Sequence, residues 1–129
     1  MIRVAIADDH EEMRIVLRLL LNLSKSSIEI ICESSNGQEA VDCVRRLEPD
    51  VLVMDIRMPV LDGLEAARQI ADLSVKTRVI LMSSYRGQMI ADEAASAGAR
   101  GFLPKDDLVK SVLKAIEMVY RGETFFVES

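Results

Sequence analysis

Short apolar runs and longer amphipathic stretches alternate along this chain of 129 residues, and this alternation constrains the fold more than any other feature. The short runs are rich in β-branched residues, as buried strands are, whereas the longer stretches repeat their apolar residues with the helical period of about 3.6. The apolar faces of the first and last helices include Val16 and Val109. Five strand-then-helix units follow one another, with strands at 2–7, 28–32, 51–54, 77–82 and 101–103. Because right-handed crossovers place helices on both faces of a parallel sheet, the pattern predicts a doubly wound α/β fold.

One common strand order in such sheets, 2-1-3-4-5, places the first strand beside the third. We therefore predict a five-stranded parallel sheet of the (βα)5, flavodoxin-like type within residues 1–121, followed by a tail at 122–129. Local signals support the helix boundaries. Asn36 and Glu39 have the spacing of a capping pair, and Gly98 stands where a left-handed residue ends a helix.

Acidic residues follow two of these strands. Asp8 and Asp9 come after the first strand, and Asp55 closes the third. The carboxyl ends of these two strands meet at the switch point of the predicted sheet, where ligands bind in α/β folds. Crowded carboxylates repel one another unless a cation compensates, and an all-oxygen cluster suits Mg²⁺. The sequence therefore predicts a magnesium site.

Two further polar residues follow the other central strands. Ser83 comes after the fourth strand and Lys105 after the fifth, with Ser84 as the alternative hydroxyl. A carboxylate nucleophile, a metal ion, a hydroxyl and an ammonium are together suited to phosphoryl transfer. We expect an acyl phosphate on Asp55, whereas Asp62 is better explained as a helix cap.

Charge and hydropathy exclude several classes of protein. The net charge is −5, from 21 acidic and 16 basic residues, so the chain should repel a phosphodiester backbone rather than bind it. No apolar run approaches the length of a membrane span, and the N-terminus does not have a signal-peptide pattern. We expect a cytoplasmic protein without a membrane partner.

The cysteines and the histidine have structural explanations. Cys32 and Cys43 lack metal-binding spacing and fall in a strand and a helix, so we expect buried, reduced thiols. His10 has no second histidine or cysteine nearby, and we interpret it as a residue at the start of a helix.

Four motifs in order resemble the response-regulator receiver domains of two-component signalling, and the likeness covers residues 2–120. The motifs end the first, third, fourth and fifth strands, and together they are far more specific than any one alone. They are Ala7-Asp8-Asp9-His10, Met54-Asp55 through Asp62-Gly63, Leu81-Met82-Ser83-Ser84, and Gly101-Phe102-Leu103-Pro104-Lys105.

The resemblance assigns a role to each residue of the metal site. It implies that Asp55 is the phosphoacceptor and, with Asp9, a direct ligand of Mg²⁺. It implies that Asp8 binds the ion through water and that the main-chain carbonyl of Arg57 is a further ligand.

The resemblance also implies a switch. Ser83 would hydrogen-bond to the phosphoryl group, Lys105 would pair with it, and Phe102 would be the aromatic residue whose burial follows the movement of Ser83. The surface formed by the fourth helix, the fifth strand and the fifth helix would then change. A sensor histidine kinase or a phosphotransfer protein would supply the phosphoryl group.

Finer details resemble the subgroup whose receivers precede a helix-turn-helix output domain, the NarL/FixJ/LuxR type. These details are Asp8-Asp9-His10, a serine at 83 and the run Ala97-Gly98-Ala99-Arg100-Gly101. Residues 122–129 then begin a linker to an output domain outside this chain, through which DNA would be bound. A single-domain regulator is the alternative, and a homodimer is possible in either case.

The sequence departs from many members of the family after Lys105, where Asp106 replaces proline and a cis peptide bond would be costly. Arg57 and Tyr85, each two residues beyond a site residue, are large. Our hypothesis is that they screen the acyl phosphate from water and slow its loss.

Two other classes share this topology. A flavin- or nucleotide-binding protein would have a glycine- and hydroxyl-rich loop after the first strand, whereas this chain has acidic residues there. An aspartyl-nucleophile phosphatase, a true enzyme, would have a second acid two residues after Asp55, where Arg57 stands. We therefore expect a signalling protein that assists its own phosphorylation and dephosphorylation, rather than an enzyme.

Overall fold

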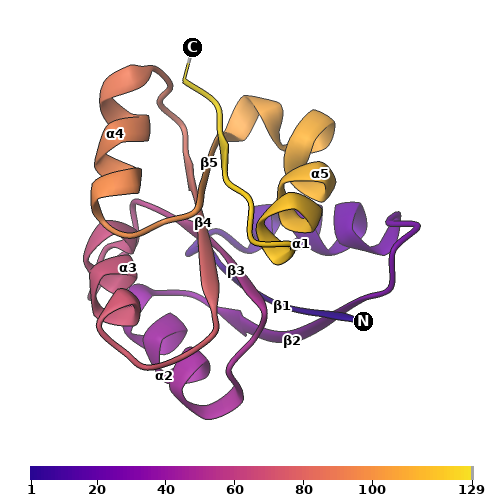
Figure 1. Cartoon of the computed structure of the whole chain (residues 1–129), viewed down its shortest axis with the longest axis horizontal. Helices are drawn as coiled ribbons and strands as arrows, with labels where there is room; N and C mark the ends of the chain where they lie inside the picture. The colour runs from indigo at the N-terminus through magenta and orange to yellow at the C-terminus, as the bar shows by residue number, and fades with distance from the viewer. Residues whose placement is uncertain (129) are drawn as a thin grey trace.

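The computed structural model describes residues 1–128, in which helices cover both faces of one parallel sheet (Figure 1). The strand order is β2-β1-β3-β4-β5-β6. The elements are β1 (Ile2–Ala7), α1 (Glu11–Asn22), β2 (Ile28–Ser34), α2 (Gly37–Leu47), β3 (Val51–Asp55), α3 (Gly63–Ala71), β4 (Arg78–Ser83), α4 (Gln88–Ser96), β5 (Gly101–Pro104), the 3₁₀ turn η1 (Lys105–Asp107), α5 (Leu108–Tyr120) and β6 (Phe125–Phe126). None of the helices in these residues is both long and apolar enough to cross a membrane.

The predicted order of the first five strands is confirmed, but the predicted number of strands is wrong because the sheet has six. The tail returns beside β5 and pairs with it as β6 (Figure 1). The Phe125 amide donates to the carbonyl of Arg100 at 3.1 Å, and the Val127 amide donates to that of Phe102 at 3.0 Å. These bonds satisfy backbone groups that β5 would otherwise leave unpaired at the edge of the sheet.

Glycine in β5 lets β6 approach closely. A Cβ atom on Gly101 would lie 3.0 Å from the carbonyl oxygen of Phe125, tighter than ordinary contact. The two phenylalanines of β6 then pack on opposite faces of the sheet, because side chains alternate along a strand. Phe125 contacts the core cluster beneath α1 and α5, and Phe126 contacts the cluster beneath α2, α3 and α4.

The sheet separates two apolar clusters, and β3 contributes to both. Val51 and Val53 face the cluster that includes residues of α1 and α5, whereas Leu52 and Met54 face the cluster that includes residues of α2, α3 and α4. All four side chains are fully buried. A central strand covered on both faces reads as an uninterrupted apolar run, which is why residues 51–54 carry so clear a strand signal.

Side-chain caps begin two of the helices. Asn36 Oδ1 accepts a hydrogen bond from the Glu39 amide at 2.9 Å. Glu39 Oε1 accepts a hydrogen bond from the amide of Ser35, the residue before the cap, at 2.9 Å. Asp62 Oδ1 accepts from the Glu65 amide at 2.8 Å, which confirms the predicted capping role of Asp62.

The pairing of β2 with β1 contains an irregularity. Val4 pairs with Ile30 and Ala5 pairs with Cys32, so that Ile31 is an extra residue on β2. Such a bulge bends the strand and increases its local twist. β2 forms the edge of the sheet opposite β6.

Candidate functional site

Four adjacent strands deliver polar side chains to one edge of the sheet. Asp8 follows β1, Asp55 ends β3, Ser83 ends β4 and Lys105 follows β5. The register aligns these ends, since Ser83 pairs with Pro104, the residue before Lys105. Strand order therefore brings together residues that are far apart in the sequence, since 97 positions separate Asp8 from Lys105.

Lys105 joins the two buried carboxylates. Its Nζ donates a hydrogen bond to Asp55 Oδ2 at 3.1 Å and forms an ion pair with Asp8 Oδ2 at 3.0 Å. The Asp8 side chain is fully buried. Its Oδ2 has no hydrogen bond of good geometry, so the ion pair with Lys105 is what compensates this oxygen. A buried carboxylate oxygen held only in this way retains capacity for a cation.

The same environment shifts the pKa of both Asp55 and Lys105. Burial raises the pKa of Asp55 above its ordinary value, and the charge of Asp8 raises it further. Lys105 and the main-chain N–H of Arg57, which hydrogen-bonds to the Asp55 carboxylate, lower it by less. Burial lowers the pKa of Lys105, but the contact with Asp8 and the charge of Asp55 raise it by more, so that it is raised overall. Lys105 is therefore a fixed positive charge near neutral pH.

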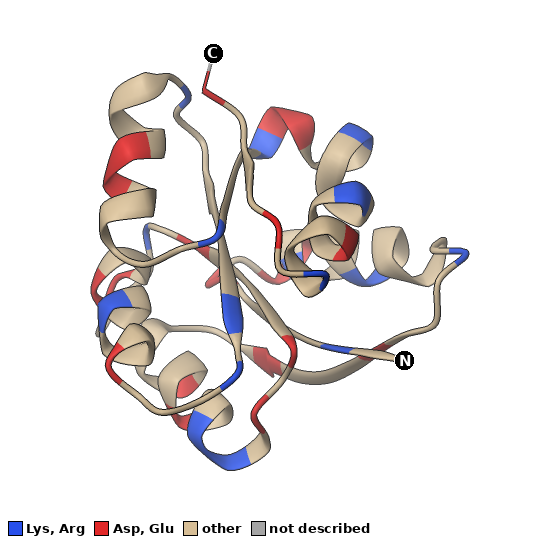
Figure 2. Cartoon of the chain, viewed as in Figure 1, with Lys and Arg blue, Asp and Glu red and all other residues tan. Residues whose placement is uncertain are grey.

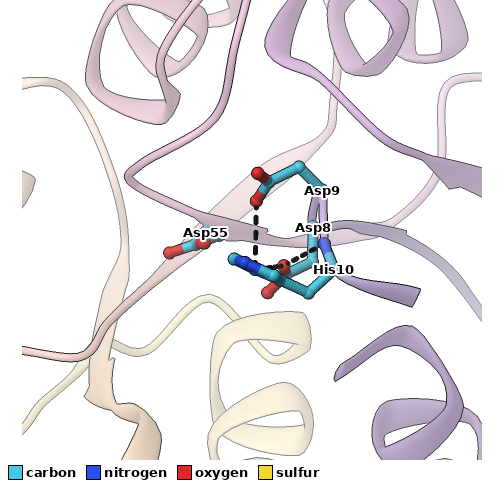
Figure 3. Close-up of side chains that lie close together, drawn as sticks. All are labelled: Asp8, Asp9, His10 and Asp55. Atoms are coloured by element: carbon cyan, nitrogen blue, oxygen red, sulfur yellow. Dashed lines mark hydrogen bonds and ion pairs between the residues drawn. The ribbon is translucent and has the colours of Figure 1, made fainter. Parts of the chain in front are cut away.

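Asp9 and His10 complete a cluster of possible metal ligands. Asp8, Asp9, His10 and Asp55 each offer one ligand atom, and these four atoms lie within 4.8 Å of one another (Figure 3). Asp9 is exposed, whereas Asp8 and Asp55 are buried. Because three of the four donors are carboxylates and one carboxylate oxygen lacks a hydrogen bond, these residues fit a hard divalent cation such as Mg²⁺.

The position of His10 was not anticipated. It begins α1 as its N-cap residue, as predicted, but its side chain makes no capping hydrogen bond. Instead the ring lies over the acidic pair, with Nδ1 3.3 Å from both Asp8 Oδ1 and Asp9 Oδ1 (Figure 3). The signal available in the sequence was its place directly after two acidic residues at a strand end.

Ser83 and Phe102 lie where the sequence places them. Ser83 is buried and its Oγ accepts a hydrogen bond from the Tyr85 amide at 3.0 Å, whereas Ser84 is exposed. Phe102 is fully buried in the cluster beneath α2, α3 and α4 and pairs with Leu81 of β4. Their switching roles stay predictions.

The side chains of Arg57 and Tyr85 are in contact with each other. The guanidinium carbon of Arg57 lies 5.2 Å from the centre of the Tyr85 ring, a cation–π arrangement. Two separate loops, after β3 and after β4, are joined by this contact. The ligand role of the Arg57 carbonyl stays a prediction.

The loop after β3 shapes the solvent side of the site. An open groove of about 670 Å³ is lined by Asp9 and His10, by residues 56–59 and by Asp62. At its end α3 begins against the backbone of β3, where a Cβ atom on Gly63 would lie 2.2 Å from the carbonyl oxygen of Asp55. Glycine at 63 is therefore required for α3 to begin beside the phosphoacceptor candidate.

The peptide bonds in residues 1–128 are all trans, including the one after Lys105.

Comparison with known proteins gives a consistent result. The family model of the response regulator receiver domain matches residues 4–117. The chain is 35% identical over 122 residues to the transcriptional regulatory protein LnrK of Bacillus subtilis, a match that covers 95% of this chain and 55% of LnrK. It is also 35% identical over 125 residues to the response regulator UvrY of Escherichia coli, covering 97% of this chain and 57% of UvrY. The chain thus spans little more than half the length of these relatives.

A solved structure agrees in fold. The signal receiver domain of NarL from Mycobacterium tuberculosis superposes with a TM-score of 0.89 at 33% identity, covering 95% of this chain and 98% of that domain. The family model, the relative UvrY and this solved structure are therefore all described as response regulators or their receiver domains.

Proposed function

The chain belongs to the response regulator receiver domain family, and from that premise we propose that Asp55 accepts a phosphoryl group which switches the domain between two states. The observation that carries this proposal is the position of Lys105, whose Nζ lies about 3 Å from the carboxylates of both Asp8 and Asp55. A partly buried cation between two buried acids, at the end of a parallel sheet, is suited to hold a dianionic group.

Mg²⁺ is the proposed cofactor. Asp9, Asp55 and the main-chain carbonyl of Arg57 would hold it directly, and Asp8 would hold it through water. When bound, it neutralises the charge that builds up on the phosphoryl oxygens. The carboxylate cluster within 4.8 Å supports this assignment.

Each residue of the site then has its own role in phosphoryl transfer. A carboxylate oxygen of Asp55 attacks phosphorus as the bond from phosphorus to the donor imidazole nitrogen breaks, so one acyl phosphate forms and a neutral histidine leaves after taking a proton. Lys105 pairs with a phosphoryl oxygen, and Ser83 donates a hydrogen bond to another. The groove beside Arg57 leaves the site open to a donor protein.

The signal would leave the site through the core. Phosphorylation draws Ser83 toward the phosphoryl group, and the Phe102 ring moves into the space that is vacated. This biases an existing equilibrium of the surface formed by α4, β5 and α5, on which β6 and the tail also lie. The hydrogen bond from Gln88 Nε2 in α4 to Glu128 Oε2, at 2.7 Å, joins the tail to this surface.

The proposed partners follow from the family. A cytoplasmic sensor histidine kinase or phosphotransfer protein supplies the phosphoryl group, and a homodimer forms in one of the two states. The relative LnrK is a transcriptional regulatory protein, and the match covers only 55% of its length, so DNA would be bound by an output domain outside residues 1–129. The charges of this chain support that division, because Lys and Arg are dispersed among acidic residues rather than gathered on one face (Figure 2).

Intact-mass analysis after incubation with acetyl phosphate and Mg²⁺ tests the proposal. Wild type should gain one phosphoryl group and Asp55→Asn none, while the matched control Asp62→Asn, which alters a capping acid of the same loop, should gain one. Labelling of Asp55→Asn equal to wild type would overturn the assignment. Turnover of a simple phosphomonoester would favour the alternative, an aspartyl-nucleophile phosphatase.

A further inference from the structure

We propose that His10 is an additional metal ligand of the acidic site, through Nδ1, and that it makes this site favour Mn²⁺ and Co²⁺ over Mg²⁺. The inference rests on the metal site of the proposed function and adds a specificity-determining residue to it. Imidazole nitrogen binds transition-metal ions with an affinity that rises from Mn²⁺ to Co²⁺, whereas Mg²⁺ prefers oxygen donors, a preference that Mn²⁺ shares in part.

The distances around His10 are those expected of neighbouring ligands. Its Nδ1 lies 3.3 Å from Asp8 Oδ1 and 3.3 Å from Asp9 Oδ1. This is long for a hydrogen bond, whose usual length is about 2.9 Å. Two adjacent ligand atoms with metal bonds of about 2.1 Å lie about 3 Å apart. A small movement of the ring would therefore place one ion in contact with His10 and Asp9.

The backbone fixes the ring in this place. The His10 amide donates to Asp8 Oδ1 at 2.9 Å, and this turn directs the His10 side chain back over the carboxylates. The His10 carbonyl accepts hydrogen bonds from Met13 and Arg14 in the first turn of α1. Helix formation and the acidic turn thus hold the main chain on both sides of the ring.

The imidazole has no other structural task. N-cap side chains ordinarily accept a hydrogen bond from the first turn of the helix, and that of His10 does not. The side chain is 63% exposed, so it does not serve the core either. Within residues 1–128, the polar contacts of the ring are with the two acids alone.

The competing explanation is a simple ion pair between a protonated ring and the acids. The two explanations differ in what an added metal ion does, because a ligand nitrogen shares electron density with the metal whereas an imidazolium is displaced by it. His10 is the only histidine of the chain, so in protein without an affinity tag any imidazole signal must come from this residue.

Two measurements on the whole chain test the inference. Calorimetric titration with MnCl₂, CoCl₂ and MgCl₂ should show Co²⁺ affinity about tenfold lower in His10→Asn than in wild type, Mn²⁺ affinity lower by a smaller factor, and Mg²⁺ affinity nearly unchanged. Pulsed electron paramagnetic resonance of the Mn²⁺-loaded protein should show imidazole ¹⁴N modulation in wild type and none in His10→Asn. Asparagine is a favoured N-cap residue, so this variant should keep α1 intact.

The outcomes separate this inference from the proposed function. Equal Mn²⁺ and Co²⁺ affinities in wild type and His10→Asn, or wild type without ¹⁴N modulation, would overturn the role of His10 and leave the Mg²⁺ site intact. Asp9→Asn should lose affinity for all three ions. If it binds Mg²⁺ as wild type does, the metal assignment under the proposed function fails instead.

Discussion

The acidic end of the sheet and its β6 edge are both assembled from residues distant in sequence, but opposite forces hold them. At the acidic end, burial works against the charges of Asp8 and Asp55, and Lys105 compensates them. At the β6 edge, burial of Phe125 and Phe126 and two backbone hydrogen bonds all favour the folded state. The comparison indicates that the first region is built for chemistry at a cost in stability, whereas the second contributes stability without chemistry.

Of all these variants, Lys105→Met should lower the stability of the folded protein most. It leaves two buried carboxylates without their cation, and loss of one partner from a buried ion pair costs about 3 kcal/mol. Urea denaturation at pH 7 should show this loss, and added Mg²⁺ should recover part of it. If the variant without Mg²⁺ is as stable as wild type, the two buried carboxylates do not need the charge of Lys105 in the folded protein.

Phe126→Ala should come next, at about 2 kcal/mol, because the ring is half-buried and full burial of phenylalanine is worth more. The same denaturation experiment measures it, with Thr124→Ala, an exposed residue of the tail, as the control. Labelling of Asp55 by acetyl phosphate should be unchanged in both variants. Slower labelling in Phe126→Ala would mean that the edge also serves the site.

Asp55→Asn should stabilise the protein at pH 7, by less than Phe126→Ala destabilises it, since it removes a buried charge beside Asp8. The sign of the pH dependence follows from the raised pKa. The folded state holds the Asp55 proton more tightly than the unfolded state, so wild-type stability falls as pH rises from the ordinary value of 3.8 through the folded-state pKa. The advantage of the variant should therefore shrink on acidification. Unfolding curves at pH 7 and pH 4 measure both effects, and an advantage that grows on acidification would contradict desolvation as the cause.

Arg57→Ala and Tyr85→Ala should give the smallest effect. Each breaks an exposed cation–π contact worth about 0.5 kcal/mol, which corresponds to a two- to threefold faster loss of the phosphoryl group if the pair screens it. A mass time course after removal of acetyl phosphate measures the rate, with Arg68→Ala as the control. The double variant should be no faster than either single one, and additive effects would show that the two residues act separately.

The sequence was most informative where a residue's place follows from strand order. Asp8, Asp55, Ser83 and Lys105 each end or follow a clearly apolar run, so predicting the sheet was enough to predict their convergence. β6 could not be predicted in this way, because a two-residue strand has no period and its stability comes from pairing with β5.

Helix periodicity did not predict how deeply each side chain of an apolar face is buried. Val16 and Val109 share the apolar period of their helices, yet they are 37% and 77% exposed. Each lies at the side of the buried stripe, next to a fully buried leucine, Leu17 in α1 and Leu108 in α5. Periodicity identifies a face but not how much of that face has a neighbour. The ring of His10 was missed for a related reason, since the direction of a side chain at a helix start depends on the turn before it.

The extra residue in β2 has a consequence for behaviour at high concentration. A strand from a neighbouring molecule could add to the free side of β2 only by matching Ile31, which interrupts the regular ladder, while carrying its own chain past the exposed Glu29. Irregular edge strands that carry a charged side chain discourage sheets from joining edge to edge into fibres. The bulge therefore helps this domain to remain dispersed in a crowded solution.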